Sequence, residues 1–471
     1  MKDGGISISR RQFLKASLAG SAVLSLPGLS LLNARSETER PPNFVVIFCD
    51  DLGYQDVGCF GSPLISTPRL DKMADEGARF TDFYAAAAVC TPSRAALMTG
   101  CYPVRVNLPT VLFPTSTVGL NPNETTIASM LKTRGYATAC IGKWHLGHLK
   151  PFLPTSHGFD SYFGIPYSND MGGMKGKYPN AALMRNEKII EQPADQETLT
   201  RRYTQEAVKF IKKNKDRPFF LYLPHTFPHV PLHASEKFKD TSRRGLYGDV
   251  VEEIDWSTGQ ILDTLKDLGL DENTLVIFTS DNGPWLGFKH LGGCALPLRS
   301  GKGDTYEGGM REPCIMRWPG HIPAGTVCSE SASTMDLLPT FAKLAGAKAP
   351  TDRIIDGKNI WPLMAGVKGA KSPHESFFYY WKYELHAVRS GKWKLILEHK
   401  DTKTGKPTPL ALYDLRADIS EKNDVSAQYP SVVKRLFAMA ERMRDDLGDE
   451  ITGRPGKNRR PVGCVGEPRI K

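Results

Sequence analysis

The chain has 471 residues, of which 40% are hydrophobic, and a formal net charge of +10. This length can bury the core of one large domain and a smaller one. The charge falls to +7 without residues 1–34, because that segment carries four cations and one carboxylate. No dense basic patch remains, which argues against a nucleic-acid partner. The nine cysteines include no Cys-x-x-Cys pair, so neither a zinc ribbon nor a dense disulfide framework is indicated, although Cys294, Cys314 and Cys328 could pair in an oxidising compartment.

The amino terminus has the features of an export signal. Residues 9–15 contain two consecutive arginines and precede an apolar run over residues 16–32, which is followed by Ala34. This order of charges, apolar residues and a small residue is typical of a twin-arginine signal. We therefore expect residues 1–34 to direct the protein through the twin-arginine export machinery to the periplasm or the medium. The glycines, serines and proline of the run predict a poor membrane span, although retention of the segment as an anchor is left open.

Two short apolar, β-rich runs end in oxygen-bearing side chains. Residues 43–49 and 274–280 both have the pattern of a buried strand. The residues that follow these strands are Asp50, Asp51, Asp281 and Asn282. Singly they would be ordinary turn residues. Together, three carboxylates and an amide oxygen without paired cysteine or histidine predict a hard-cation site that favours Ca²⁺ or Mg²⁺ over Zn²⁺.

Cationic and titratable side chains follow other predicted strands. Residues 136–141 lead to Lys143 and His145, which would point to the same side of an extended segment. A glycine-rich loop over residues 299–313 offers Lys302. Taken alone, each lysine is equally consistent with a solvated surface charge. If they lie together, they can stabilise negative charge that develops during a reaction.

The alternation of strands and helices predicts an α/β fold with a large, mostly parallel sheet. The helical patterns between the strands cover residues 124–134, 199–213, 249–268 and 335–345. All the polar motifs follow strands, so they are expected at the carboxyl edge of the sheet, where such folds bind ligands. From about residue 375 the pattern changes. Residues 377–380 and 386–397 predict strands of a small antiparallel sheet, and residues 432–447 predict a terminal helix.

Residues 90–94 read Cys-Thr-Pro-Ser-Arg and are followed by Ala-Ala-Leu-Met-Thr-Gly. By itself, Cys90 could be a buried structural cysteine. With the motifs above, however, residues 43–320 resemble the sulfatase family, and within it the arylsulfatase A and N-acetylgalactosamine-6-sulfatase branch. This resemblance implies an alkaline-phosphatase-like fold, with a catalytic domain over residues 35–370 and a C-terminal subdomain over residues 371–471. It also implies hydrolysis of sulfate monoesters, on sulfated carbohydrates or aryl sulfates.

In this family the motif cysteine is oxidised to formylglycine, whose hydrate is the nucleophile. One hydroxyl of the hydrate attacks sulfur, and the other allows sulfate to be expelled, whereas a serine would leave a stable sulfate ester. The resemblance therefore assigns Cys90 as the nucleophile and Arg94 as the cation that steadies it. It also implies a sulfatase-maturation enzyme as a partner, which would act before the folded protein is exported.

The resemblance assigns roles to the remaining motifs. It implies Ca²⁺, with Mg²⁺ as the less favoured ion, bound by the modified Cys90 and by Asp50, Asp51, Asp281 and Asn282. Lys143 and Lys302 would bind the sulfate group, and His145 would contact the formylglycine hydrate. Among the histidines after the strand at 219–223, His229 matches the family's substrate-side histidine, which protonates the leaving group, and His225 is the alternative. Ser168 lies in a segment that resembles the loop placing a serine near the site.

Two other functions are consistent with parts of this pattern. A phosphonate monoester or phosphodiester hydrolase would use the same fold and the same modified cysteine. A non-catalytic protein that binds sulfated glycans would be expected to have lost Cys90 or one of the acidic pairs, and this chain retains them. The loops over residues 171–186 and 285–298 are expected to shape the substrate pocket, but their residues do not indicate which sugar is bound or whether attack is at a chain end.

Overall fold

The structure is a computed structural model that describes Met1 and residues 40–171 and 178–466. In these residues an eleven-stranded mixed sheet has the order β11-β2-β10-β9-β1-β8-β4-β5-β6-β7, with β12 beside β2. Its strands are β1 (Asn43–Cys49), β2 (Ala78–Tyr84), β4 (Ala137–Ile141), β5 (Ser161–Gly164), β6 (Leu183–Arg185), β7 (Lys188–Glu191), β8 (Phe219–Pro224), β9 (Thr274–Ser280), β10 (Arg311–Arg317), β11 (Thr326–Cys328) and β12 (Ala332–Ser333). The pairs from β9 through β1, β8 and β4 to β5 are parallel, whereas β10 pairs antiparallel with β9 and β2. The predicted mixed, mostly parallel sheet is therefore confirmed.

The central strand β1 is buried along its whole length. Successive side chains of a strand point to opposite faces of its sheet. Accordingly, Phe44, Val46 and Phe48 belong to one hydrophobic core, and Val45 and Ile47 belong to the core on the other face. Each such side chain contributes about 1.5–3 kcal/mol to folding when it is fully buried. A continuous apolar strand of this kind requires cover on both faces of the sheet.

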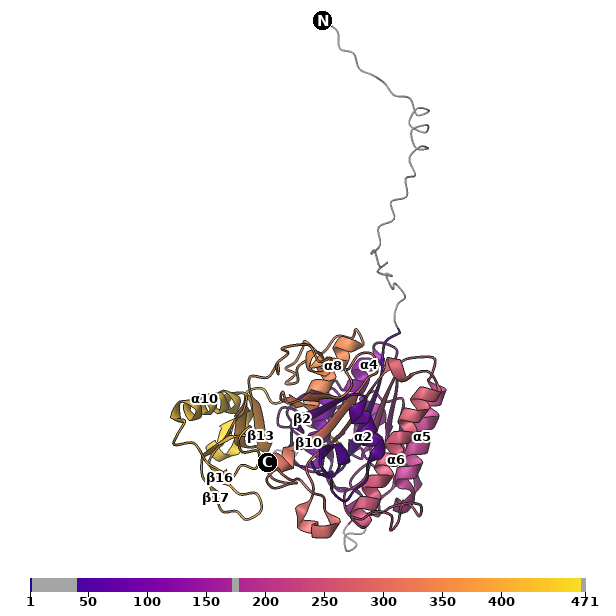
Figure 1. The fold of residues 1–471 in the computed structure, drawn as a ribbon, viewed down its shortest axis with the longest axis horizontal. Helices are drawn as coiled ribbons and strands as arrows, with labels where there is room; N and C mark the ends of the chain where they lie inside the picture. Colours follow the sequence, from indigo (N-terminus) through magenta and orange to yellow (C-terminus); the bar gives the residue numbers. More distant parts are fainter. Residues whose placement is uncertain (2–39, 172–177, 467–471) are drawn as a thin grey trace. The chain divides into compact units, whose positions relative to one another are not determined.

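Helices supply that cover. The core that contains Val45 also contains residues of α2 (Pro68–Asp75), α5 (Leu199–Lys213) and α6 (Leu246–Asp267), and α5 and α6 lie side by side in Figure 1. The core that contains Phe44 includes residues of α3 (Cys90–Thr99), α4 (Ile127–Lys132) and α8 (Leu337–Leu344). The first residue of α3 is thus the cysteine of the sequence motif, and this helix is buried throughout.

The helices agree with the sequence patterns except at some ends. Helix α5 has the predicted bounds, whereas α4 is shorter than the predicted 124–134. The Oγ1 of Thr126 accepts a hydrogen bond from the amide of Ser129 at 3.0 Å, which caps the helix and fixes its start. The helix expected over 335–345 begins as a 3₁₀ turn at Thr334–Asp336 and continues as α8.

The C-terminal part forms a second, four-stranded antiparallel sheet in the order β13-β14-β15-β18. The strands are β13 (Phe377–Trp381), β14 (Glu384–Ser390), β15 (Trp393–Ile396) and β18 (Ala411–Asp414), and α10 (Pro430–Leu447) packs on them. The range 386–397, predicted as one strand, contains a turn at Gly391, whose φ is 57°. Lys394 of β15 joins this sheet to the short helix α7 (Glu307–Met310), which directly precedes β10, through an ion pair with Glu307 at 3.0 Å.

All nine cysteines lie in the described part of the chain, and each is a free thiol. The pairing considered for Cys294, Cys314 and Cys328 is therefore not formed. Within the described residues, no helix is long and apolar enough to cross a membrane. The possible N-terminal anchor at residues 16–32 lies outside the described residues.

Candidate active site

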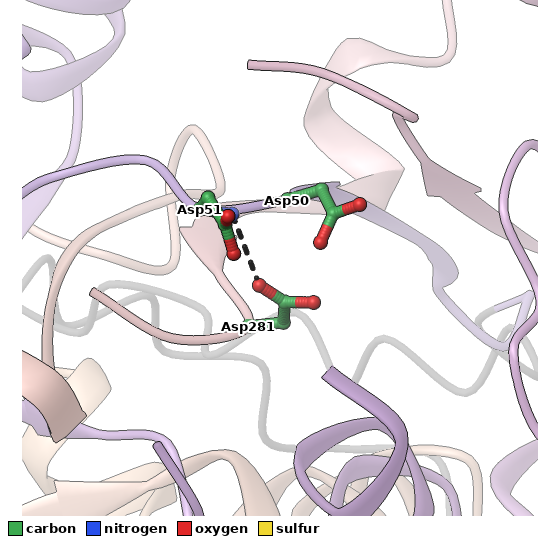
Figure 2. Close-up of side chains that lie close together, drawn as sticks. All are labelled: Asp50, Asp51 and Asp281. Carbon is green, nitrogen blue, oxygen red and sulfur yellow. Dashed lines mark hydrogen bonds between the residues drawn. The ribbon is translucent and has the colours of Figure 1, made fainter. Parts of the chain in front are cut away.

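Three carboxylates meet at the carboxyl edge of the large sheet. Strands β1 and β9 are parallel and pair in register up to Cys49 and Ser280, so the residues that follow them are neighbours. The side chains of Asp50, Asp51 and Asp281 each offer an oxygen within 4.8 Å of the other two (Figure 2). All three are buried, and the amide of Asp51 donates to Asp281 Oδ1 at 3.2 Å. The predicted acidic cluster is therefore present.

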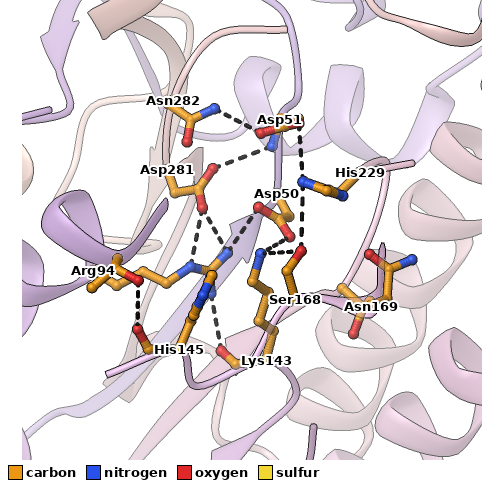
Figure 3. A network of polar contacts seen from close by, with 12 residues as sticks. Asp50, Asp51, Arg94, Lys143, His145, Ser168, Asn169, His229, Asp281 and Asn282 are labelled. Atoms are coloured by element: carbon orange, nitrogen blue, oxygen red, sulfur yellow. Dashed lines mark hydrogen bonds and ion pairs between the residues drawn. The ribbon is translucent and has the colours of Figure 1, made fainter. Parts of the chain in front are cut away.

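Three cations surround these carboxylates. Arg94 donates from Nε and Nη2 to Asp281 Oδ2 at 3.0 and 2.7 Å, and Lys143 Nζ lies 2.5 Å from Asp50 Oδ2 (Figure 3). Lys302 Nζ lies 2.8 Å from the carboxylate of Asp51. Buried charges require such partners because the protein interior solvates them poorly. Neither lysine is therefore the solvated surface charge that each could have been alone.

The pKa values of the cluster follow from burial and mutual charge. Although burial alone would raise it, the nearby ammonium of Lys143 holds the pKa of Asp50 well below its usual range. Burial, and then the charge of Asp50, raise the pKa of Asp281 to about 7. A second positive charge beside Asp281 would lower that pKa again.

Two oxygen atoms of this cluster lack hydrogen-bond partners. They are Asn282 Oδ1 and Asp50 Oδ1, and both are buried, although Asp50 Oδ1 lies 3.4 Å from Arg94 Nη2 in an ion pair. Asn282 instead uses its Nδ2 to donate to Asp51 Oδ1 at 2.7 Å, which leaves its oxygen available. A buried acceptor without a partner costs about 1–3 kcal/mol. Oxygen donors from two strand ends, two of which accept no hydrogen bond, fit a hard cation such as Ca²⁺ or Mg²⁺.

Cys90 begins α3 and is 2% exposed. Burial raises the pKa of its thiol, although the charges of Lys143 and Lys302 oppose that rise. The helix is tied to the loop after β4, because Arg94 Nη1 donates to the carbonyl of Lys143 at 2.9 Å. Thr91 Oγ1 donates to the carbonyl of His145 at 3.0 Å. These contacts place Cys90 where the positive charges of Lys143 and Lys302 act on its thiol.

His145 differs from the sequence expectation in its backbone. Its φ is 59°, so residues 143–145 do not form the extended segment assumed for placing both side chains on one side. His145 Nε2 lies 2.9 Å from the carbonyl oxygen of Leu112, and its buried Nδ1 has no partner. Burial, followed by the charge of Lys143, holds the pKa of His145 well below its usual value, so the ring is neutral at neutral pH.

His229 lies at the cluster and His225 does not. His229 Nε2 is 3.6 Å from Asp51 Oδ2 and 3.5 Å from Ser168 Oγ, while its Nδ1 lies 2.5 Å from the carbonyl oxygen of Val230 (Figure 3). Ser168 in turn accepts a hydrogen bond from Lys143 Nζ at 3.1 Å. His225 contacts Ser257 of α6 at 3.4 Å instead. The contacts thus favour His229 over His225 as the candidate proton donor.

The loop that carries Lys302 is fixed by close packing and backbone hydrogen bonds. The amide of Gly303 donates to the carbonyl of Ala88 at 2.8 Å, which joins this loop to the segment before Cys90. A Cβ on Gly283 would lie 1.8 Å from the carbonyl oxygen of Gly308, so only glycine fits there. This packing brings a loop distant in sequence against the end of β9.

Sequence patterns alone missed one residue that touches this cluster. The indole ring of Trp285 lies 5.6 Å from the His229 ring between centroids, and Lys302 Nζ lies 4.5 Å from its centroid. The sequence placed Trp285 only in the loop 285–298, which was expected to shape the substrate pocket, and gave it no contact with the cluster. No periodicity predicts a contact made by a loop.

Comparisons with known proteins agree with this geometry. The family model named Sulfatase matches residues 42–347, and a model described as N-sulphoglucosamine sulphohydrolase, C-terminal, matches residues 301–446. Human arylsulfatase A is 42% identical over 455 residues, which cover 87% of this chain and 89% of that protein. N-acetylgalactosamine-6-sulfatase of Canis lupus familiaris is 43% identical, with 79% of this chain and 74% of that protein covered.

A solved structure and the N-terminal segment add to this result. The crystal structure of Ps i-CgsB in complex with k-i-k-neocarrahexaose has a TM-score of 0.75 and 34% identity, and the match covers 86% of this chain and 93% of that one. Residues 7–27 match the twin-arginine translocation signal model, which indicates export to the periplasm or the medium. The chain belongs to the sulfatase family and is a sulfuric ester hydrolase with an alkaline-phosphatase-like fold.

Proposed function

We propose that this protein hydrolyses sulfate monoesters of saccharides after export, with a formylglycine derived from Cys90 and a bound Ca²⁺. The observation that carries this proposal is the convergence of three buried carboxylates, three cations and the first residue of α3 at one sheet edge. Saccharides are favoured because the related Ps i-CgsB structure is a complex with an oligosaccharide.

The metal would be held by Asp50, Asp51, Asp281 and Asn282, with the modified Cys90 as a further ligand. The buried oxygens of Asp50 and Asn282 that accept no hydrogen bond support this assignment. An oxygen-only ligand set suits Ca²⁺, which tolerates irregular geometry, better than Mg²⁺, which requires near-ideal octahedral geometry. The ion would polarise a sulfate oxygen and stabilise the negative charge that develops on it.

The hydrated formylglycine at position 90 would supply the attacking hydroxyl and a second hydroxyl for sulfate release. Arg94 links the start of α3 to Asp281 and to the loop after β4, which would help to position residue 90. Asp281, which is joined to α3 through Arg94, would accept a proton from the attacking hydroxyl at its carboxylate. A sulfatase-maturation enzyme in the producing cell is the partner that would oxidise Cys90.

Lys143 and Lys302 would bind the sulfate oxygens, since both ammonium groups already point at the cluster. Because Nδ1 faces the carbonyl oxygen of Val230 and must itself carry a proton, His229 would be doubly protonated when it donates from Nε2 to the leaving alcohol. Burial and Lys302 lower the pKa of this ring, and the nearby carboxylate of Asp51 opposes that decrease. Its Nδ1 contact with the carbonyl of Val230 orients Nε2 towards Asp51 and Ser168. Ser168 would position both Lys143 and His229, and His145 would contact the nucleophile.

The experiment is sulfate release by protein expressed with a maturation enzyme, assayed on 4-nitrophenyl sulfate and on a panel of sulfated mono- and oligosaccharides. We expect release from one or more saccharides, and its loss in Cys90→Ala. Lys403→Met, an exposed lysine outside the cluster, is the matched control and should remain active. Hydrolysis of a phosphonate monoester without sulfate release would replace this proposal with the phosphonate monoester or phosphodiester hydrolase alternative.

A further inference from the structure

Trp285 stands at the boundary between the buried cluster and solvent. It follows Asp281-Asn282-Gly283-Pro284 and is half-buried, whereas the next residue, Leu286, is 42% exposed. Phe288, which is 40% exposed, packs edge-on against the indole with centroids 4.8 Å apart. Together, the side chains of Trp285, Leu286 and Phe288 form an apolar surface, the apolar wall.

The indole contacts the two groups that would act on opposite sides of the ester bond. Lys302 Nζ, the proposed sulfate ligand, lies 4.5 Å from the ring centroid, within the range of a cation–π interaction. The His229 ring, the proposed donor to the leaving group, lies 5.6 Å away in an edge arrangement. A leaving group that is bonded to sulfate at Lys302 and faces His229 would therefore lie near Trp285.

The backbone holds the wall in this place. The carbonyl of Pro284 accepts a hydrogen bond from the amide of Lys302 at 3.0 Å, so the tryptophan and the lysine loop are linked through the main chain. A Cβ on Gly301 would lie 3.0 Å from Leu286 Cγ, which shows how closely the wall packs on that loop. The wall is therefore a fixed surface rather than an isolated exposed side chain.

The chemistry of the wall selects a particular kind of leaving group. An indole face and two aliphatic or aromatic neighbours favour a flat apolar surface, such as an aryl ring or the C–H face of a pyranose. No residue in the described part of the chain accepts a hydrogen bond from the indole Nε1, so this donor is available to a hydroxyl or ring oxygen. A small acyclic alcohol would use neither feature.

We propose that Trp285 is a specificity-determining residue that packs against the ring of the leaving group and selects cyclic sulfate esters. This inference rests on the proposed function, because it places the sulfate at Lys302 and the leaving oxygen at His229. It goes beyond that function by naming the part of the substrate that the enzyme contacts, which is the flat face of the leaving-group ring. A pyranose and an aryl ring would make the same contact with Trp285. The experiment distinguishes these two kinds of substrate.

The test compares wild type, Trp285→Ala and Trp285→Phe, with Trp256→Ala as the matched control. Trp256 is a half-buried tryptophan of α6 that packs on Phe238 with centroids 5.8 Å apart. The measured quantities are kcat and KM for 4-nitrophenyl sulfate and for a sulfated monosaccharide, and the inhibition constant of inorganic sulfate. Melting temperatures establish whether each variant is folded. If Trp285→Ala does not fold, the comparison uses Trp285→Phe in its place.

We expect Trp285→Ala to lower kcat/KM about tenfold, mainly through KM, because one ring contact is lost. Trp285→Phe should retain most of the activity, and the inhibition constant of inorganic sulfate should change less than twofold in both variants. A decrease in kcat/KM on just one of the two substrates identifies which ring, aryl or pyranose, contacts the apolar wall. A parallel rise in the inhibition constant and in KM would overturn the inference, since Trp285 would then act by holding Lys302. Wild-type protein that is inactive on both substrates would instead overturn the proposed function.

Discussion

Lys302→Met removes one charge from the cluster while keeping most of the side-chain volume. In the structure Lys302 Nζ lies 2.8 Å from Asp51, and the side chain is 9% exposed. Asp51 keeps the hydrogen bond from Asn282 at 2.7 Å and the contact with His229 at 3.6 Å, so its carboxylate is not left alone. We therefore expect an effect on catalysis, together with a loss of stability from the buried carboxylate that has lost its cation, and the melting temperature of the variant separates the two.

The size of that effect follows from the role of the ammonium. Removing one preorganised donor from a developing oxyanion costs about 2.7–4 kcal/mol, or a 10²–10³-fold decrease in kcat. The assay is steady-state sulfate release by wild type and Lys302→Met, with inhibition by inorganic sulfate as a measure of ground-state binding. Lys403→Met is the control, because Lys403 Nζ contacts Ser300 of the same loop at 3.2 Å and is exposed. A decrease of less than about threefold in Lys302→Met would refute the role assigned to this lysine.

Three further predictions concern the metal, pH and local stability. Adding Ca²⁺ at about 100 times its dissociation constant should stabilise the chelator-treated protein by about 2.7 kcal/mol, and Asp50→Asn should abolish this shift in thermal unfolding; an equal shift in the variant would contradict the ligand assignment. Although burial lowers it, the charge of Asp336, at 2.7 Å, raises the pKa of His374 overall. A raised folded-state pKa means stabilisation that is complete below the unfolded pKa of about 6.5 and is lost as pH rises through the folded pKa. His374→Gln should therefore make the denaturant midpoint of unfolding depend less on pH between pH 6 and 8. An unchanged pH dependence would contradict a stabilising His374–Asp336 pair. Thr126→Ala should lower the free energy of unfolding by about 1 kcal/mol through loss of the α4 cap, measured by urea unfolding, and no change would show that the cap contributes little.

The parts of the fold that were predictable are those set by local pattern. Helix α5 has its predicted bounds because its apolar residues, such as Tyr203 and Ile211, recur with helical spacing and are buried. The same argument failed for residues 386–397, where every residue suits a strand except the glycine at which the chain turns. A single residue with positive φ is enough to divide a strand into two.

The carboxylate cluster was predictable because parallel strands bring their carboxyl ends together. Asp50 and Asp281 are 231 positions apart in the chain, yet the register of β1 and β9 makes them neighbours. Trp285 and the backbone of His145 were not predictable in this way. Their positions depend on loop conformation, which follows from tertiary packing rather than from the periodicity of the residues.

The central claim is that Cys90 is the precursor of a catalytic formylglycine in a sulfatase site. The most direct measurement is the mass of the peptide containing Cys90, from protein expressed with a maturation enzyme, together with the rate of sulfate release by the same preparation. We expect the mass of formylglycine at position 90 and a rate of sulfate release that is proportional to the modified fraction. Sulfate release by protein that retains an unmodified Cys90, or in Cys90→Ala, would contradict it.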